Sequence, residues 1–339
     1  FYLPNGVVSI YIFVERDDDG SEFASVSKIL NQTTEKLEMI DICIVEQDSP
    51  ELLVFLGLMS NKIPKLRFRD SMLSEGVCAC LMASIMRPDG LEALEIQEMS
   101  TGDHISTHQI SLLCEAIAMS SSLRSFSMKP YDKTFSVEAC TAIVSALRRN
   151  RSLKSFELSV NFPNGILLQN IVNAALFGPT RLETLDLSEI SEGDELRLPL
   201  SLLIDGLCRE GCTLKKIDLS FEIAVDVDLA STAAENSSLE HLTFRYANLT
   251  CAHVVDFAKL FNSLQFISLS FNPISDLAAL DVLLLGEAAI LETLCLNIKW
   301  VPEEEWLEFC EKLPRMKSLR SLVITQEPFT TYSETCRTA

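Results

Sequence analysis

Two histidines at the start of a helical pattern have the spacing most similar to a metal site. His104 and His108 lie four residues apart, and Asp103 directly precedes the first of them. Side chains at i and i+4 share one face of a helix, and imidazole is a common zinc ligand. The segment DHISTHQ carries no glutamate between the histidines, however, and it lies where a loop enters a helix. We therefore expect chance spacing and no bound metal, with zinc as the alternative.

Eleven cysteines, an odd number, indicate free thiols rather than a disulfide framework. Cys78-x-Cys80 and Cys208-x-x-x-Cys212 have no further cysteine at metal-ligand spacing. Most cysteines lie among Leu, Ile and Ala in amphipathic patterns, where cysteine packs as a small apolar residue. Free buried thiols are typical of a reducing compartment. We expect a cytoplasmic protein, with a nuclear location as the alternative, and disfavour secretion.

The sequence motifs of common catalytic sites are missing. The chain has no GxxxxGK[ST], GxGxxG or GxSxG sequence, so nothing indicates a phosphate-binding loop or a serine nucleophile. Four histidines are too few for an evident proton relay. We expect no enzymatic activity and no cofactor.

The charge balance limits the class of partner. Lys and Arg number 28 and Asp and Glu number 48, so the net charge is −20. Nucleic acid and anionic membrane both require a basic surface, so neither is expected as a partner. The most apolar stretch, 277–291, is too short to span a bilayer and contains Asp281 and Glu287.

A frame of three apolar residues, spaced L-x-x-L-x-L, recurs about every 28 residues and predicts short buried strands. The frames are Val7/Ile10/Ile12, Leu37/Ile40/Ile42, Ile63/Leu66/Phe68, Leu91/Leu94/Ile96, Leu123/Phe126/Met128, Leu153/Phe156/Leu158, Leu182/Leu185/Leu187, Leu214/Ile217/Leu219, Leu239/Leu242/Phe244, Leu264/Ile267/Leu269, Leu291/Leu294/Leu296 and Leu319/Leu322/Ile324. Frame positions are numbered from the first apolar residue.

Between the frames the apolar period changes to that of a helix. Segment 136–149 places Val137, Cys140, Ile143, Val144 and Leu147 on one stripe, and segments 106–119 and 302–313 repeat the pattern. Ser, Asn and Thr clusters close the helices before the next strand. Each unit is therefore strand, loop, helix and return loop, and neighbouring units must stack to share a core.

The unit LQFISLSFNPIS (264–275) matches L-x-x-L-x-L-x-x-N-x-I, with Asn272 at the asparagine position and Ile274 after it. The chain thus resembles the leucine-rich repeat proteins, specifically the long-repeat class of ribonuclease inhibitor, Ran GTPase-activating protein and the sensor ends of NOD-like receptors. The resemblance covers about residues 7–325. Only Asn161 also retains the asparagine, so we expect an irregular solenoid without a continuous asparagine ladder.

The resemblance implies an α/β solenoid shaped as a horseshoe, with a parallel sheet on the concave face and helices on the convex face. We expect a single domain of about 12 irregular repeats over residues 1–325 and a polar tail over residues 326–339. In this architecture frame positions four and six point into the core, and positions three, five and seven point outward.

Frame position five carries acidic residues in three consecutive repeats: Glu157, Asp186 and Asp218. Equivalent residues on adjacent strands lie ~5 Å apart, where like charges repel by on the order of 1 kcal/mol per pair. The row is either a solvated face, with Lys154, Lys215 and Lys216 neutralising the carboxylates, or a docking surface for a basic partner. At position seven, small Ser159, Ser188 and Ser220 would leave room for that partner.

Long repeats at the middle of the chain suggest a second partner-facing feature. Their extra length falls between strand and helix, at 99–105, 129–136 and 189–197. Insertions at one place in successive repeats project from the same rim, which is often a binding rim. Neutral drift in surface loops explains them equally well.

We therefore predict a monomeric, non-enzymatic scaffold that recognises a basic protein partner on its concave sheet. The residues expected to bind are Glu95, Glu157, Asp186 and Asp218, with Lys154, Lys215 and Arg245 setting the register. Similarity to the family leaves three alternatives: a stoichiometric inhibitor of a basic enzyme, a GTPase activator that offers Arg16, or a sensor segment of a larger regulatory protein.

Overall fold

The computed structural model describes residues 9–14, 39–44, 50–59, 63–69, 73–98, 105–130, 134–187, 197–227, 236, 238–247, 249–274, 290–298, 303–315 and 318–326. The chain divides into two compact units, unit 1 (Phe1–Leu196) and unit 2 (Arg197–Ala339). The expectation of one domain over residues 1–325 stays a prediction, and residues 327–339 of the expected tail lie outside the described residues.

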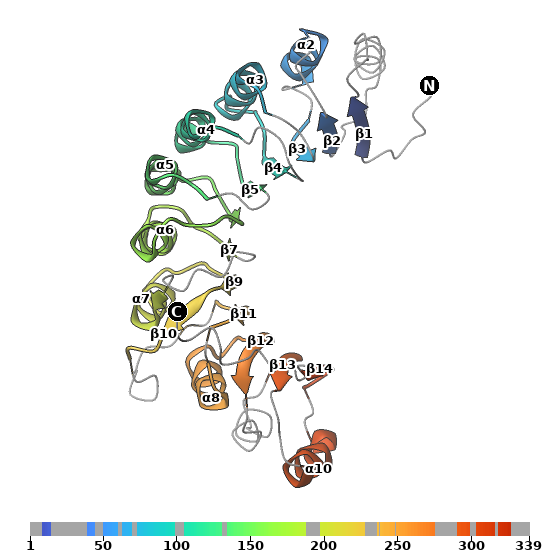
Figure 1. Cartoon of the computed structure of the whole chain (residues 1–339), viewed down its shortest axis with the longest axis vertical. Coiled ribbons are helices and arrows are strands. Elements are labelled where there is room, and N and C mark those ends of the chain that lie inside the picture. Colours follow the sequence, from blue (N-terminus) through green and yellow to red (C-terminus); the bar gives the residue numbers. More distant parts are fainter. Residues whose placement is uncertain are drawn as a thin grey trace, which may run out of the picture. The chain divides into compact units, whose positions relative to one another are not determined.

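Unit 1 alternates strands with helices. In chain order its elements are β1 (Ser9–Val14), β2 (Met39–Ile44), α2 (Pro50–Met59), β3 (Lys65–Arg69), α3 (Glu75–Ile85), β4 (Ala93–Glu98), α4 (Thr107–Met119), β5 (Ser125–Pro130), α5 (Val137–Arg149), β6 (Ser155–Leu158), α6 (Gly165–Phe177) and β7 (Thr184–Leu187). The strands pair in sequence order and all are parallel. The helices lie along one side of this sheet (Figure 1).

Unit 2 continues the same alternation. Its elements are β8 (Arg197–Pro199), α7 (Leu200–Leu207), β9 (Lys216–Ser220), β10 (Glu222–Ala224), β11 (His241–Arg245), α8 (Cys251–Leu260), β12 (Phe266–Ile274), β13 (Thr293–Ile298), α10 (Glu303–Lys312), the 3₁₀ turn η2 (Leu313–Arg315) and β14 (Ser321–Gln326). Strands β9, β11, β12, β13 and β14 form a parallel sheet. A separate pair, β8 with β10, uses the end of the long 189–197 segment.

The strand register confirms the repeat frames. In unit 1 the position-four residues Leu94, Phe126 and Phe156 pair across β4, β5 and β6. In unit 2, Leu242 pairs with Ile217 on one side and Ile267 on the other. Positions four and six of the described frames are buried from β2 to β13, so they form the core of each unit. Each unit is therefore an α/β solenoid with a parallel sheet on one side and helices on the other.

The helices bury most of the expected apolar stripes. In α4 the predicted residues Ile110, Leu113, Cys114 and Ile117 are all buried. In α5, however, Val137 is 52% exposed. It is the first helical residue, and the buried stripe of this helix begins only at Ala139, so the prediction for Val137 is wrong.

A polar cap begins several of these helices. Ser74, Ser106, Ser136 and Asn164 each accept a hydrogen bond from a backbone N–H in the first turn of α3, α4, α5 and α6 respectively. Such caps satisfy donors that have no partner within the helix. The same chemistry therefore begins a helix in four consecutive repeats.

The return loops are joined by buried amides and hydroxyls. Asn150 donates from Nδ2 to the Ile117 carbonyl at 2.6 Å, and its Oδ1 accepts from the Leu153 N–H at 2.8 Å. Ser120 lies in the preceding return loop, and it donates at 2.8 Å to the carbonyl of Ile85, the last residue of α3. In unit 2, Asn236 donates to the Leu207 carbonyl and accepts from the Leu239 N–H.

The expected asparagine position is used where the sequence matches best. Asn272 accepts from the N–H groups of Ala247 and Leu249 at 3.0 Å and donates to the Phe244 carbonyl at 2.8 Å. Asn161 is only half-buried. Of the buried asparagines in the described residues, Asn150 and Asn236 therefore lie in return loops, and Asn272 lies at the expected position.

Candidate functional site

The face of the sheet opposite the helices, called the sheet face below, carries frame positions three, five and seven. At its start in unit 1, Arg67 lies between two carboxylates. Its Nε is 2.6 Å from Glu95 Oε2, and its Nη1 is 3.7 Å from Asp41 Oδ2. Arg69, at position seven, adds Nε at 3.0 Å from the same Asp41 oxygen. On β2, β3 and β4 the position-five residues Asp41, Arg67 and Glu95 therefore alternate in charge, and the cations neutralise the carboxylates on the neighbouring strands.

Glu157 occupies a similar environment farther along unit 1. Lys129 Nζ lies 2.6 Å from Glu157 Oε1, and Ser127 donates to Oε2 at 2.7 Å. Burial raises the pKa of Glu157, but hydrogen bonds from Lys129 and Ser127 and the charge of Lys129 outweigh it, so the pKa of this carboxyl is lowered. Glu157 and Asp186 occupy paired positions on β6 and β7, as the frames predict.

In unit 2 the predicted residues Asp218 and Arg245 are brought together. Arg245 Nη2 lies 3.5 Å from Asp218 Oδ2, and it comes from position seven of the neighbouring strand. Arg69 likewise reaches Asp41 on the preceding strand, whereas Lys129 reaches Glu157 on the following strand; in all three pairs a position-seven cation meets a position-five carboxylate one strand away.

The cations that neutralise the position-five carboxylates are therefore not the lysines that the sequence suggested. Lys154 Nζ binds Glu183 Oε1 at 2.9 Å in the return-loop region, not the position-five row. Lys215 and Lys216 are exposed at the beginning of β9. Lys154 and Lys215 stand at frame position two, which strand alternation turns away from the face that carries positions five and seven. Lys216, at position three, is on that face but is exposed at the first residue of β9. Reading position seven for cations would have found Arg69 and Lys129.

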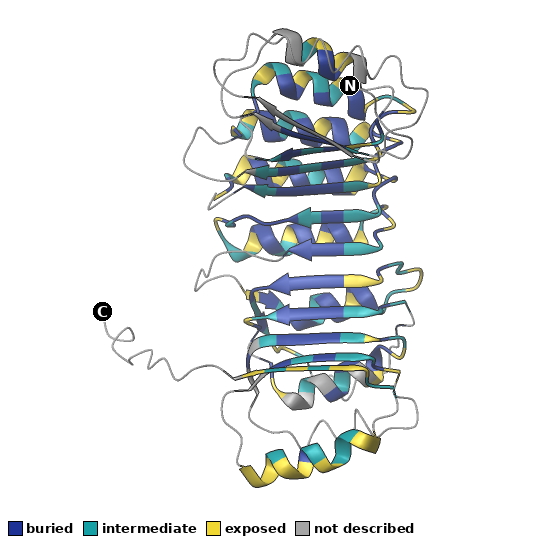
Figure 2. Cartoon of the chain, turned by 90° about the vertical axis from the view of Figure 1, so that its right-hand side faces the viewer, coloured by how far each residue is buried: buried dark blue, intermediate teal, exposed yellow. Residues whose placement is uncertain are grey.

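The position-five side chains are less accessible than expected. Asp186 is 8% exposed and Asp218 6% exposed, whereas the side chains of Glu95 and Glu157 are 28% and 27% exposed. Neighbouring strands lie about 4.8 Å apart, so short carboxylates are covered by the side chains on either side. Figure 2 shows that much of the sheet face is buried or half-buried. Glu95 and Glu157 are the accessible carboxylates among the predicted acidic residues.

Small side chains occupy position three beside these two glutamates. At position three, Ala93, Ser125, Ser155 and Thr184 are half-buried on four consecutive strands. At position seven, Ser159 is buried, and Ser188 lies outside the described residues. The small residues at position three therefore leave room on one side of each glutamate, away from its paired cation.

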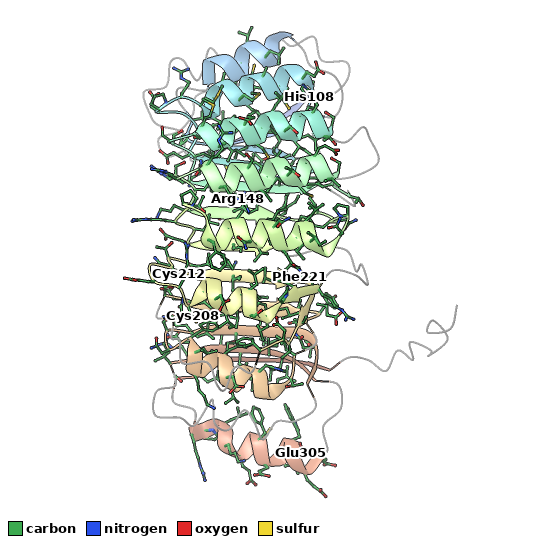
Figure 3. All side chains as sticks on the ribbon, turned by 90° about the vertical axis from the view of Figure 1, so that its left-hand side faces the viewer. His108, Arg148, Cys208, Cys212, Phe221 and Glu305 are labelled. Atoms are coloured by element: carbon green, nitrogen blue, oxygen red, sulfur yellow. The ribbon has the colours of Figure 1, made fainter. Side chains whose placement is uncertain are left out.

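Several other sequence predictions concern residues beyond the described ranges. His104 and Arg16 lie outside them, as do 99–104, 131–133 and 189–196 of the inserted segments. His108 is exposed on α4, on the helix side (Figure 3). Within the described part of the chain, no group of three or more His, Cys, Asp or Glu side chains is arranged to hold a metal ion.

Eight cysteines with described side chains are free thiols, of which three are buried and five are half-buried. Burial raises the pKa of Cys114 to about 12 and that of Cys140 to about 11. Cys295, expected to be exposed at position five, is half-buried between β12 and β14, and burial raises its pKa as well. The thiolate is the nucleophile, so these environments suppress cysteine reactivity.

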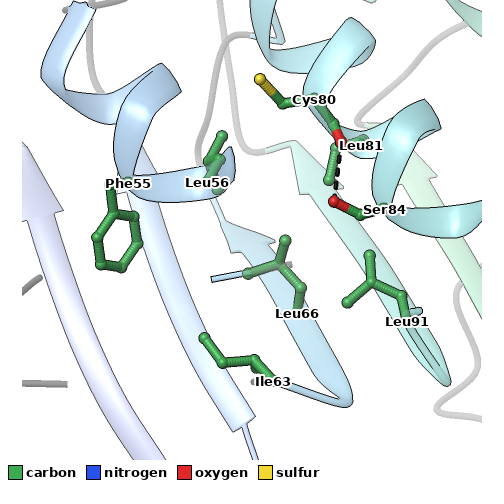
Figure 4. Close-up of a pocket in the computed structure, with 8 residues that line it drawn as sticks. All are labelled: Phe55, Leu56, Ile63, Leu66, Cys80, Leu81, Ser84 and Leu91. Carbon is green, nitrogen blue, oxygen red and sulfur yellow. Dashed lines mark hydrogen bonds between the residues drawn. The ribbon is translucent and has the colours of Figure 1, made fainter. Parts of the chain in front are cut away.

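An apolar gap between α2, β3 and α3 is too small for a ligand. Its lining residues are Phe55, Leu56, Ile63, Leu66, Cys80, Leu81, Ser84 and Leu91 (Figure 4). It admits about one water-sized sphere, and the Ser84 hydroxyl already donates to the Cys80 carbonyl at 2.8 Å. The gap is a packing feature of the core.

No family model and no curated protein matches this chain. Its structure is similar to 39 chains of solved structures. One belongs to the crystal structure of the Rad7 and Elc1 complex in yeast, with 14% sequence identity, a TM-score of 0.49, and coverage of 84% of this chain and 68% of that chain. At this identity and TM-score the similarity assigns neither a family nor a partner. Among the described helices, none is long and apolar enough to cross a membrane.

Proposed function

We propose that this protein is a recognition scaffold that binds a basic protein segment on the sheet face of unit 1. The observation that carries the proposal is the pair of accessible carboxylates, Glu95 and Glu157. Each is held in place by a cation at 2.6 Å and both stand on strands of a hydrogen-bonded sheet. Charged groups that are already ordered lose little conformational entropy on binding.

The existing ion pairs leave capacity for a partner. A carboxylate has about four lone-pair sites on its two oxygens. Glu95 uses Oε2 for Arg67, and Glu157 accepts one bond from Lys129 and one from Ser127. A basic side chain can therefore add to either glutamate without displacing its neighbour. Asp186 and Asp218, which are nearly buried, contribute by their charge rather than by direct contact.

The finer features of the proposal rest on the same observations. The alternation of short strands with long helices supports the ribonuclease-inhibitor-like class. The free thiols of the described residues support a cytoplasmic or nuclear location, and recognition without catalysis is the activity proposed. An inhibitor of a basic enzyme is a special case, in which the basic partner is that enzyme.

Charge reversal on the sheet face tests the function. The double variant Glu95→Lys/Glu157→Lys should lose capture of basic proteins from a lysate of the source organism at low salt, as measured by affinity capture and mass spectrometry. Electrostatic attraction is the expected driving force, so the wild-type capture should weaken as salt rises.

The matched control is Glu138→Lys/Glu304→Lys, which makes the same charge change on exposed positions of α5 and α10. This control should retain the captured proteins. The neutral variant Glu95→Gln/Glu157→Gln separates lost binding from lost folding, because glutamine keeps the side-chain shape. If Glu95→Lys/Glu157→Lys and Glu138→Lys/Glu304→Lys capture the same proteins equally well, the sheet face is not the binding surface.

A further inference from the structure

The return loops of unit 1 carry a cluster of basic residues in a strongly acidic chain. Loops 120–124, 150–154 and 178–183 follow α4, α5 and α6. Together with the last turn of α5 they contribute the basic rim, defined as Arg124, Arg148, Arg149, Arg151, Lys154 and Arg181. The whole chain has a net charge of −20, so this local excess of cations is a departure from its composition.

Backbone contacts hold these loops side by side. The Lys154 N–H donates to the Arg124 carbonyl at 2.7 Å, and the Glu183 N–H donates to the Lys154 carbonyl at 2.7 Å. Ser152 Oγ donates to the Ser120 carbonyl at 3.0 Å. The three loops therefore form one continuous surface.

The end of α6 also packs closely against the end of α5. A Cβ on Gly178 would lie 3.1 Å from the Leu147 carbonyl oxygen and closer still to that of Ala174. Only a residue without a side chain permits this approach, which brings loop 178–183 beside Arg148 and Arg149. A side-chain contact also joins two of the loops: Arg124 of loop 120–124 donates from Nη1 to the Ser152 carbonyl of loop 150–154 at 3.0 Å.

Carboxylates neutralise only part of this rim. Arg149 lies 3.2 Å from Glu115, and Lys154 lies 2.9 Å from Glu183. Arg148, Arg151 and Arg181 are exposed, and no ion pair joins any of them to a carboxylate of the described residues. Figure 3 shows Arg148 on the helix side, near the end of α5.

Stabilisation of helix ends explains only some of the residues in the basic rim. Cations at a helix C-terminus interact favourably with the helix dipole, which accounts for Arg148 and Arg149 in the last turn of α5. Arg124, Arg151 and Arg181 lie in the loops or at the strand entrance, where that effect does not apply. Helices α4 and α6 have no basic residue in the last turn, so the dipole is not balanced this way in every repeat.

We propose that the basic rim is a second interaction surface, which binds an acidic peptide segment of a partner protein. Guanidinium groups bind carboxylates with paired, charge-assisted hydrogen bonds. Three neighbouring loops span about 10 Å, which matches about three residues of an extended peptide. A long polyanion such as RNA fits less well, since the surrounding protein repels it.

Fluorescence anisotropy with a labelled oligoglutamate peptide tests the rim at low ionic strength. The wild-type chain binds this peptide and does not bind an oligoglutamine of equal length. The Arg148→Glu/Arg151→Glu variant should bind it about tenfold or more weakly, because two charge-assisted contacts are reversed. The matched control Arg315→Glu/Arg320→Glu, on exposed positions of unit 2, makes the same charge change and keeps the wild-type affinity.

A second variant, Arg148→Gln/Arg181→Gln, removes charge without adding acid and should also weaken binding. The proposal is overturned by any of three results. The wild type fails to bind oligoglutamate, the rim and control variants weaken binding equally, or a single-stranded RNA of equal length binds the rim more tightly than the peptide. The sheet-face variant Glu95→Lys/Glu157→Lys retains peptide binding, so failure of this proposal is distinguishable from failure of the proposed function.

Discussion

On the sheet face, three acidic side chains each have a cation diagonally across on the neighbouring strand. Asp41, Glu157 and Asp218 are paired in this way with Arg69, Lys129 and Arg245. The arrangement converts a row of like charges into alternating pairs, which explains how acidic residues recur at position five without a large penalty. For Glu157 it also keeps the pKa low despite burial.

His253 is expected to make the stability of α8 depend on pH. Its Nδ1 accepts a hydrogen bond from the Thr250 N–H at 3.0 Å, which only an unprotonated Nδ1 can do. Burial lowers its pKa below 6.5, although the charge of Asp256 acts in the opposite direction. The unfolded chain therefore takes up a proton first, and stability present above pH 6.5 is lost as pH falls toward the folded pKa.

The variant His253→Gln should remove this dependence, because glutamine accepts from the Thr250 N–H at every pH. Urea unfolding at about pH 7 and about pH 5 measures it, since a histidine titrates in that interval. The stability of the wild type relative to His253→Gln should fall at the lower pH. His108→Gln, at an exposed position of α4, is the control. A constant difference between wild type and His253→Gln would contradict the expectation.

Among the described elements, the return loops join the repeats through polar side chains. Asn150, Ser120 and Asn236 each donate to a carbonyl near the end of the helix in an earlier repeat, at Ile117 of α4, Ile85 of α3 and Leu207 of α7 respectively. Each also accepts from N–H groups of its own loop. Asn150 is completely buried, so its hydrogen bonds form away from water. Asn150 and Asn236 begin two Asn-x-Ser sequons, and their buried amides leave no access for glycosylation in the folded chain.

Asn150→Ala should destabilise the chain by about 2–4 kcal/mol, because it leaves the Ile117 carbonyl and the Leu153 N–H buried without these bonds. Urea denaturation followed by circular dichroism gives the free energy of unfolding. Ser121→Ala, an exposed position in the neighbouring return loop, should change stability by less than about 0.5 kcal/mol. Equal effects of the two substitutions would show that the hydrogen bonds of Asn150 add little to stability.

Charge is unevenly distributed over the whole molecule. The net charge is −20, yet unit 1 carries the basic rim on its return loops and accessible glutamates on its sheet face. Different surfaces of one unit thus attract partners of opposite sign. The sequence total alone would suggest only basic partners.

A net charge of −20 should also make stability rise with salt. Repulsion among like charges favours expanded states, and about 0.15 M NaCl screens it over a Debye length of about 8 Å. Thermal unfolding at low salt and at this concentration should show a higher midpoint in the second condition. Since the sheet-face pairs are partly buried, salt weakens them less than it weakens long-range repulsion. A lower midpoint in salt would mean that surface ion pairs outweigh the repulsion.

The repeat frames were predictable because strand periodicity is local. Residues such as Leu94, Phe126 and Phe156 show their buried positions by spacing alone, and the observed register matches it. The same is true of the stripe of α4 and of Asn272. The exposure of Val137 was not predictable, since the phase of the first helical turn depends on packing against neighbouring helices.

The amino-acid sequence by itself determined the repeat, its strand–helix alternation, the in-register placement of the frames and the identity of the acidic row. Tertiary structure alone decided which cations meet that row, that Asp186 and Asp218 are nearly buried, and that basic residues of three separate loops form one rim. The reason is physical. Periodicity along the chain sets the direction of each side chain, whereas contacts between strands and between loops about 30 residues apart depend on how neighbouring repeats stack.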